Sequence, residues 1–328
     1  MNRRTALIVA VISVAVVGAA WVLRLQRNDP GTASPAPTTV ASTEPGAAVT
    51  TTTTTPTTTI ADDAIVCDRY QSVTVAGPIE SGGLIETSGI AASRRSPGVV
   101  WAHNDSGDEA RLYAIGPAGE DLGSFTIDGG LAFDWEDVAI GPGPTDGDPH
   151  LYVGDIGDNF GIRQGRVTVY VVREPDPSAL SGTEPLALEL VLDSPDGAQN
   201  FEALFVADGS IFVATKDDET TSVYQGTPLD GSPTVPLELI ATIELGAEVT
   251  AADVSWDGSV IAFRGYETVW LWSRRPGDSV ANALATEPCM APSPEERQGE
   301  SLAFLADGTI TTVSEGSNVV LHLVRRDS

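Results

Sequence analysis

The sequence predicts an all-β protein of the β-propeller class, placed after an N-terminal transmembrane helix and a disordered linker. Two observations carry the propeller prediction: a three-strand phrase recurs five times after residue 62, and Asp-Gly turn signals join its strands in three of the copies. Units of about 50 residues with three or four short strands are typical of propeller blades. No long helical periodicity separates the copies, which argues against a parallel α/β fold.

Composition excludes several classes of function. The chain has 328 residues, with 46 Asp and Glu against 18 Lys and Arg, and a formal net charge of −28. A surface this acidic repels phosphate backbones, so we expect no nucleic-acid partner. Two cysteines and three histidines are too few for a Cys/His zinc module or an iron–sulfur cluster.

The first element, residues 1–27, predicts a membrane anchor with a short N-terminal tail. Residues 6–23 are eighteen uncharged residues flanked by arginines. At ~1.5 Å per residue, a helix of this length just covers a ~30 Å hydrocarbon core. A cleaved signal peptide, with a shorter apolar run of ~7–15 residues, is the alternative. We therefore expect a single-pass protein of the cell membrane whose globular domain is extracytoplasmic.

The second element, residues 28–62, is composed almost entirely of Pro, Thr, Ala, Ser and Gly, with six consecutive threonines from Thr50. Such a segment buries too little to offset its ordering entropy, so we expect a disordered linker. Its composition also suits O-glycosylation, and a plain spacer is the alternative.

The third element, residues 63–328, contains the five phrases, which begin 48 to 66 residues apart. Each phrase has an apolar first strand, a second strand ending in a polar residue, and a third strand with an aromatic residue or His. The segment around Val73 would supply the outer strand of the last blade and close the ring. We expect five blades; six is the alternative if the longest interval, between Glu136 and Glu202, contains a degenerate blade.

The two cysteines, Cys67 and Cys289, lie at the start of the domain and just before the fifth phrase. In an exported protein such a pair favours a disulfide over two free thiols. Ring closure would bring both residues into or beside the last blade.

Polar residues recur at the start of the first strand and at the end of the second. Because these two strands are antiparallel neighbours, both positions meet at the same rim of a propeller channel. The first column contains Ser88, Glu136, Glu202, Ala252 with its neighbour Asp253, and Glu300. The second column contains Asn104, Asp155, Lys216, Arg264 and Glu315. We interpret this acidic rim as a ligand site, although polar strand ends in water would look the same.

Closely spaced oxygen ligands make calcium the candidate cofactor. Two runs, residues 104–109 and 155–159, combine Asp and Asn with the Gly of tight turns, and residues 134–137 add three carboxylates. Calcium binds 6–8 hard oxygens, which such loops supply. The candidate metal ligands are Asp105, Asp108, Asp134, Glu136, Asp137, Asp155, Asp158 and Asn159. The alternative is that these residues only make turns.

Several phrases resemble those of a group of poorly characterised exported bacterial β-propellers, typical of actinobacteria. That group is distantly similar to the phytase-like, esterase-like and SdiA-regulated propellers. The resemblance covers roughly residues 80–328, and DWEDVA with GDIGDN is its most distinctive part. It implies the propeller and calcium on rim carboxylates. Ser88 and Ala252 depart from the first-column Glu, and the basic cluster expected of a phytase is missing, so phytase activity is not carried over.

The sequence thus predicts a binding module whose acidic rim takes a metal ion with a small molecule, glycan or protein. The rival hypothesis is a hydrolase, glycosidase or phytase/esterase-like, that uses the same carboxylates. Glycoside hydrolysis needs only two carboxylates at a suitable separation. A serine hydrolase is disfavoured because the chain contains no G-x-S-x-G motif.

Overall fold

The structure, a computed structural model, describes residues 66–143, 146–180, 182–228 and 232–327. The chain divides into two compact units, Met1–Thr59 and Ile60–Ser328, and all described residues belong to the second. The predicted membrane helix and linker therefore lie outside the described residues. Among the residues that are described, no helix is both long enough and apolar enough to cross a bilayer.

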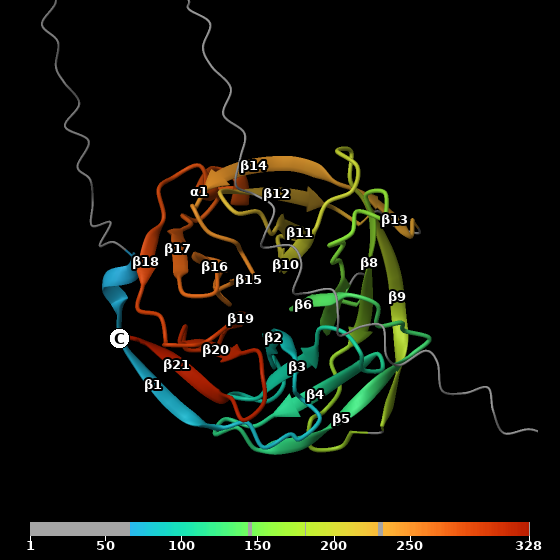
Figure 1. Cartoon of the computed structure of the whole chain (residues 1–328), viewed down its shortest axis with the longest axis vertical. Helices are drawn as coiled ribbons and strands as arrows, with labels where there is room; N and C mark the ends of the chain where they lie inside the picture. Colours follow the sequence, from blue (N-terminus) through green and yellow to red (C-terminus); the bar gives the residue numbers. More distant parts are fainter. Residues whose placement is uncertain (1–65, 144–145, 181, 229–231, 328) are drawn as a thin grey trace, which may run out of the picture. The chain divides into compact units, whose positions relative to one another are not determined.

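The second unit is a five-bladed β-propeller (Figure 1). The first blade contains β2 (Thr87–Ala92), β3 (Val100–Asn104), β4 (Arg111–Ile115) and β5 (Asp121–Asp128). The second contains β6 (Trp135–Pro142), β7 (Pro149–Asp155), β8 (Arg166–Arg173) and β9 (Thr183–Asp193). The third contains β10 (Phe201–Ala207), β11 (Ser210–Thr215), β12 (Thr220–Gly226) and β14 (Glu238–Glu244).

The fourth blade contains β15 (Ala251–Val254), β16 (Val260–Arg264), β17 (Val269–Ser273) and β18 (Cys289–Ala291). The fifth contains β19 (Gly299–Phe304), β20 (Ile310–Ser314), β21 (Val320–Arg326) and β1 (Tyr70–Pro78). Three short elements complete the described fold: η1 (Val66–Arg69), β13 (Thr234–Pro236) and α1 (Val280–Leu284). Within each blade, the strands pair antiparallel.

The ring closes between its two ends in the sequence. Each innermost strand contacts the next, from β2 through β6, β10 and β15 to β19, and β19 contacts β2. The outer strand of the fifth blade is β1, which pairs with β21 and places Val73 opposite Val324. The prediction of five blades is therefore confirmed. The long interval between Glu136 and Glu202 holds a single blade with an extended outer strand, β9.

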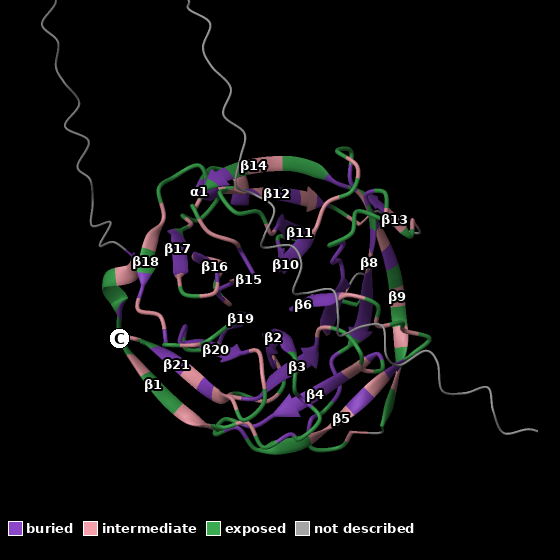
Figure 2. Ribbon diagram, in the orientation of Figure 1, coloured by how far each residue is buried: buried purple, intermediate pink, exposed green. Residues whose placement is uncertain are grey.

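Tight turns and burial follow the predicted pattern. The hairpin of β10 and β11 turns at Asp208 and Gly209, both with positive φ, which is the backbone that an Asp-Gly turn supplies. The innermost strands are buried on both sides, while the outer strands are mostly exposed or half-buried (Figure 2). Apolar residues on both faces of an inner strand are needed because neighbouring blades cover both of them.

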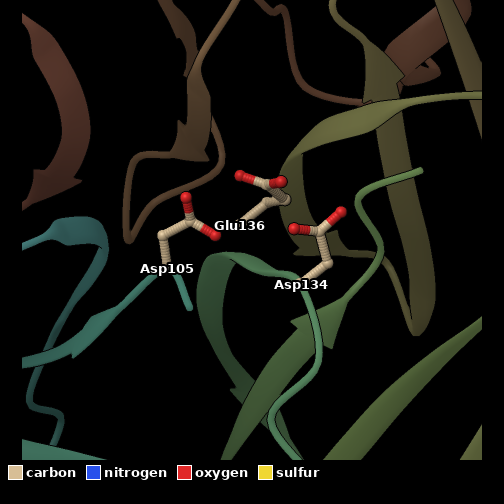
Figure 3. A group of neighbouring side chains, drawn as sticks. All are labelled: Asp105, Asp134 and Glu136. Atoms are coloured by element: carbon tan, nitrogen blue, oxygen red, sulfur yellow. The ribbon is translucent and has the colours of Figure 1, made fainter. Parts of the chain in front are cut away.

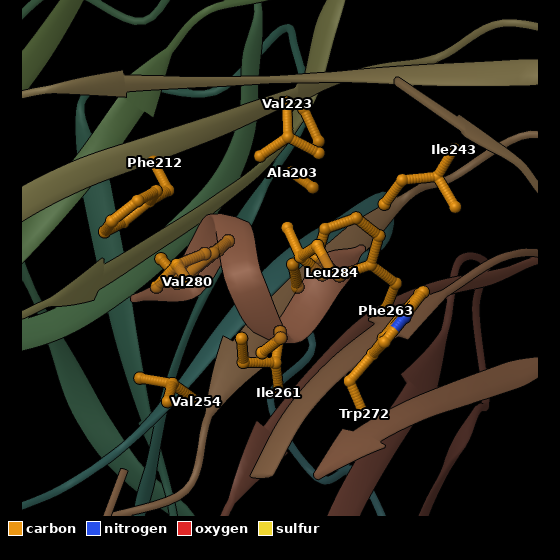
Figure 4. Packing of buried hydrophobic residues seen from close by; sticks show 14 of the residues in the cluster. Ala203, Phe212, Val223, Ile243, Val254, Ile261, Phe263, Trp272, Val280 and Leu284 are labelled. Carbon is orange, nitrogen blue, oxygen red and sulfur yellow. The ribbon is translucent and has the colours of Figure 1, made fainter. Parts of the chain in front are cut away.

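The core lies between adjacent blades. Between the third and fourth blades, Phe205 and Phe263 lie with ring centroids 6.2 Å apart; Phe212 stacks on Phe205 at 4.7 Å, and Trp272 meets Phe263 at 5.1 Å. The short helix α1 adds Val280 and Leu284 to this cluster (Figure 4). Burial of each such side chain contributes roughly 1.5–3 kcal/mol, so these interfaces fix the blades, and with them the rim.

The disulfide prediction is confirmed. Cys67 and Cys289 are bonded, with Cα atoms 6.0 Å apart. Cys67 belongs to η1, which leads into β1 of the fifth blade, and Cys289 begins β18, the outer strand of the fourth. The bond therefore ties the closing strand to the neighbouring blade.

Candidate functional site

The two predicted polar columns lie at one end of the ring. The antiparallel register places Thr87 opposite Asn104, Trp135 opposite Asp155 and Gly299 opposite Ser314. The starts of the first strands and the ends of the second strands therefore share one rim.

A cavity of about 90 Å³ opens at this rim, and we call it the acidic mouth. Polar side chains line almost all of it. Its lining residues are Glu86, Thr87, Ser88, Asp105, Glu136, Asn159, Glu202, Lys216, Tyr266, Gln298, Glu300 and Glu315. Sequence reasoning missed four of them: Glu86, Thr87, Tyr266 and Gln298. Each lies one or two residues from a column position, so a wider window around each strand end would have included them.

Three carboxylates converge beside this cavity. Oxygens of Asp105, Asp134 and Glu136 all lie within 4.8 Å of one another, close enough to share one metal ion. Asp105 follows β3, Asp134 precedes β6 and Glu136 belongs to β6, and the three point toward a common space (Figure 3). These residues come from the first and second blades, and the packing of these adjacent blades brings them together.

Because Gly157 has no side chain, the carboxylates of Asp134 and Glu136 have space beside it. Its backbone, with that of Ile156, is held by hydrogen bonds from both amides to the Asp134 carbonyl, each 3.2 Å. A Cβ at position 157 would collide with the carboxylates of Glu136 and Asp134. The second acidic run therefore contributes a close backbone approach rather than the ligand set expected of it.

On the other side of the mouth, Glu202 forms an ion pair with Lys216, with Nζ 3.1 Å from Oε2. The Asn200 side-chain amide donates to the other Glu202 oxygen at 2.9 Å. The Lys216 ammonium also lies 5.2 Å from the centre of the Tyr266 ring. Among the described residues that line the mouth, Lys216 is the one with a cationic side chain.

Glu300 and Glu315 complete the ring of carboxylates through Gln298. The Gln298 side-chain amide donates to Glu300 Oε1 at 3.0 Å and also to Glu315. This amide holds two acidic side chains of the fifth blade near each other without supplying a positive charge.

Burial and mutual repulsion raise the pKa values of these acids. Burial, followed by repulsion from Glu202 and Asp105, raises the pKa of Glu136 well above its usual range. Burial and the nearby Asp134 raise the pKa of Asp105 to about 7, and burial raises that of Glu300 to about 7. Carboxylates crowded in this way favour any cation that can neutralise them.

For Lys216, the surrounding charges favour the charged form of the side chain. Burial alone would lower the pKa of this ammonium, but the Glu202 and Glu300 carboxylates outweigh burial and raise it. Lys216 therefore stays charged, and it still leaves the mouth with an excess of carboxylates.

Several predicted ligands are engaged elsewhere. Asn104 accepts from the amides of Ile85 and Glu86 and donates to Asp108 at 2.9 Å. Asp108 also accepts from the Tyr113 hydroxyl at 2.7 Å. These two residues hold the loop that carries Asp105, and they do not reach the three-carboxylate group.

Asp155 and Asp158 likewise organise loops of the second blade. Asp155 accepts from the amide of Asp134 at 3.1 Å and forms an ion pair with Arg163. Asp158 accepts from the amides of Ile162 and Arg163, and the Asn159 side chain accepts from Asn200. The structure therefore assigns Asp155 and Asp158 to loop support and leaves Asn159 at the mouth.

Asp137 and Asp253 were expected at the rim and are placed below it. Asp137 accepts from the amides of Leu204 at 2.9 Å and Ala252 at 3.2 Å, which joins the second blade to the third and fourth. Asp253 accepts from the amide of Phe304 at 2.8 Å. Neighbouring residues on a strand point to opposite sides, so each of these acids faces away from the column beside it.

Arg264 was also expected at the rim, but its side chain is fully buried beneath it. It forms an ion pair with Glu296, whose other oxygen meets His322 Nδ1 at 2.7 Å and the Thr312 hydroxyl at 2.9 Å. Gly299 packs directly against the guanidinium. Arg264 is therefore part of a buried network between the fourth and fifth blades.

Large apolar side chains are exposed on the same rim. Leu131 and Phe133 precede β6, and Phe160 and Ile162 follow β7; all four are mostly exposed. Asp155 links the two loops through Phe133 and Arg163, and the Arg163 guanidinium lies 4.9 Å from the Phe133 ring centre. We call these four residues the apolar rim patch. Sequence reasoning did not single them out.

The fold and the site define a β-propeller with an acidic mouth. The chain matches no protein-family model, and no curated protein matches it. Among solved structures, it is similar to the PQQ-bound form of aldose sugar dehydrogenase from Streptomyces coelicolor, at 14% identity over 77% of this chain and 98% of that one, with a TM-score of 0.43. It is also similar to a chain of the mitotic checkpoint complex, at 14% identity over 73% of this chain and 61% of that one, with a TM-score of 0.37. Neither likeness bears on what this protein binds.

Proposed function

We propose that this protein is a membrane-anchored, extracytoplasmic binding module whose acidic mouth holds a calcium ion and whose rim docks a macromolecular partner. The observation that carries the proposal is the convergence of Asp105, Asp134 and Glu136 within 4.8 Å. Within the described ranges, none of the three forms an ion pair with a basic side chain.

A second observation supports a cation. Oδ1 of Asp105 is buried and has no hydrogen-bond partner among the described residues. An unpaired buried oxygen costs roughly 1–3 kcal/mol, and more when it is charged. A bound cation would satisfy it. The donors here are all oxygens, which favours calcium over the softer metals that prefer Cys and His.

The size of the mouth limits what enters it. A cavity of about 90 Å³ corresponds to about three water molecules in the liquid. A metal ion that exchanges most of its water for the carboxylates fits, whereas a sugar ring or a peptide segment has to remain at the rim. The apolar rim patch gives such a ligand a hydrophobic surface, and clustered exposed apolar residues commonly mark interaction sites.

The N-terminal sequence supports the proposed location. An apolar run of eighteen residues followed by a Thr- and Pro-rich segment suits an anchor and a linker that hold the propeller away from the membrane. Neither segment lies within the described residues.

A carboxylate-based hydrolase is the second candidate. It is favoured by one observation: Glu300, with a pKa raised to about 7 by burial, lines the same cavity as Glu202, whose carboxylate is paired with Lys216. An acid with a raised pKa beside a second carboxylate is the arrangement that glycoside hydrolysis uses.

The test is the melting temperature of the purified full-length chain in EDTA and in millimolar calcium. At about 10 mM calcium, ~10–100 times a dissociation constant of about 10⁻⁴–10⁻³ M, an ion that binds only the native state adds ~1.4–2.7 kcal/mol, which is a rise of a few degrees. The Glu136→Gln variant should lose this rise, and the Glu238→Gln variant, altered at an exposed site on β14, should keep it. Equal shifts in both variants, or no shift in the wild type, would contradict the calcium proposal.

A further test separates the two candidate functions. In a hydrolase, Glu300→Gln would abolish turnover of a glycoside and leave the calcium shift unchanged. In a binding module, neither the wild type nor any variant of the mouth would hydrolyse the glycoside.

A further inference from the structure

A second cavity, of about 380 Å³, lies at the opposite ends of the innermost strands. The second, third and fourth blades contribute the last residues of β6, β10 and β15, and the first blade contributes Arg94, which follows β2. We infer that this cavity is a binding site for an organic anion, a carboxylate that carries an aliphatic or aromatic body. The site is separate from the acidic mouth and goes beyond the function proposed above.

Arg94 provides the charge. Its guanidinium carbon lies 3.9 Å from the ring centre of Trp256. Among the described residues, it forms neither a hydrogen bond nor an ion pair. An arginine has five N–H donors in a planar fork that matches a carboxylate. In Arg94, this fork has no protein acceptor.

The two acids that act electrostatically on Arg94 bind neutral donors and form no ion pair with it. They are Asp253 and Glu174. Asp253 accepts from the amides of Val254 and Phe304, both at 2.8 Å. Glu174 accepts through Oε1 from the Ser93 hydroxyl at 2.5 Å and the Trp101 indole at 3.1 Å, while its Oε2 is buried without a hydrogen-bond partner among the described residues. Neither carboxylate forms an ion pair with the guanidinium.

The acids that line the cavity are matched as well. Asp208 forms an ion pair with Arg274, the second arginine of the cavity. Asp257 accepts from the Ser255 hydroxyl at 2.7 Å and from the amide and hydroxyl of Ser259 at 3.0 and 2.6 Å. Among the charged side chains that line the cavity in the described part of the chain, Arg94 is therefore the one without a hydrogen-bond partner.

The remaining walls are apolar and fixed. Ile140, Val206 and Val254 line the cavity, and the Trp256 indole is held by its hydrogen bond to the Phe304 carbonyl at 2.9 Å. A volume of about 380 Å³ is within the usual range of small-molecule sites. A carboxylate on Arg94 would thus place its apolar part against these side chains.

The experiment is a calorimetric titration of the purified full-length chain with octanoate and benzoate. Octanol and benzyl alcohol test the apolar body alone, and acetate tests the charge alone. We expect both carboxylates with apolar bodies to bind at least tenfold more tightly than any of these three. Equal affinity for octanol and octanoate, or no binding of either carboxylate, would overturn the inference.

Two further measurements place the site. Arg94→Gln should weaken octanoate binding about tenfold to hundredfold, as expected for loss of a charge-assisted pair. Arg166→Gln, which alters an exposed arginine of β8, should leave binding unchanged. In the wild type, octanoate should protect Arg94 from modification by phenylglyoxal and leave Arg166 reactive. Unprotected Arg94, or equal affinity of the two variants, would contradict the assignment.

Discussion

The carboxylates at the acidic mouth differ in what neutralises each of them. Glu202 forms an ion pair with the Lys216 ammonium at 3.1 Å, whereas Glu300 accepts a hydrogen bond from the neutral amide of Gln298 at 3.0 Å and interacts with Lys216 only electrostatically. Glu136 is almost completely buried, and its strongest electrostatic neighbours are other carboxylates. Protonation or a bound cation must supply the missing charge. These two ways of neutralising the charge depend on pH in opposite directions. As the pH rises, the carboxyl groups lose their protons, and metal binding becomes stronger.

Glu300 makes the stability of the cation-free protein depend on pH. Its pKa is about 7 in the folded chain and ~4.3 when exposed, so the folded state holds the proton more tightly. This contribution to stability is complete below about pH 4 and is lost as the pH rises through 7. Glu300→Gln should match the wild type near pH 4.5 and be more stable by on the order of 2 kcal/mol at pH 8 in EDTA. Urea unfolding at the two pH values measures this, and a difference that is the same at both would contradict it.

Sequence reasoning predicted which strand ends carry the polar residues, because column positions follow from the repeat. It could not separate ligands from supporting residues. Glu136 and Asp137 are adjacent on β6, yet the first lines the mouth and the second accepts amides from two other blades. Only the orientation of each side chain in the closed ring distinguishes them. Arg264 illustrates the same limit, since its partner Glu296 lies outside every phrase.

At the scale of single elements, innermost strands are held to one another by acidic side chains as well as by apolar packing. Asp137 on β6 accepts from amides of β10 and β15, and Asp253 on β15 accepts from an amide of β19. Each acid thus accepts a hydrogen bond from a backbone amide of a neighbouring blade. The repeat of Glu-Asp and Ala-Asp at the starts of β6 and β15 is the sequence signature of this arrangement.

Replacing Asp137 with Ala should destabilise the propeller strongly. The change leaves two buried amides, of Leu204 and Ala252, without their acceptor. At 1–3 kcal/mol for each unsatisfied group, the expected loss is about 3 kcal/mol of unfolding free energy. Asp121→Ala, at an exposed residue that bonds only within its own turn, is the control and should change stability little. Denaturant unfolding of both variants decides, and similar midpoints would show that Asp137 does not hold the blades.

At the scale of the whole domain, the ring is closed by residues far apart in the sequence. The strand β1 completes the blade built from the last three strands of the chain, and a disulfide with a sequence separation of 222 residues fixes η1 to the fourth blade. The number of blades and this pairing were predictable because the repeat length and the cysteine positions constrain both. The parallel pairing of β9 with β5 and β13 was not predictable, because no phrase contains these outer strands.

Removing the disulfide should loosen this closure. A cross-link over so long a loop contributes about 3–5 kcal/mol in the chain-entropy model. The double variant Cys67→Ser and Cys289→Ser should therefore unfold at a lower denaturant concentration than the oxidised wild type, and the reduced wild type should match the variant. Identical midpoints for all three forms would contradict a stabilising role.

The most direct test of the account is a calorimetric titration of calcium into the full-length chain after treatment with EDTA. We predict one calcium ion per chain, with a dissociation constant of about 10⁻⁴–10⁻³ M. Gly157→Ala should abolish this binding and leave the fold intact, because its methyl group would displace the ends of the Glu136 and Asp134 side chains. Glu238→Gln should bind as the wild type does. Absence of calcium binding in the wild type, or undiminished binding in Gly157→Ala, would contradict the assignment of the acidic mouth as a calcium site.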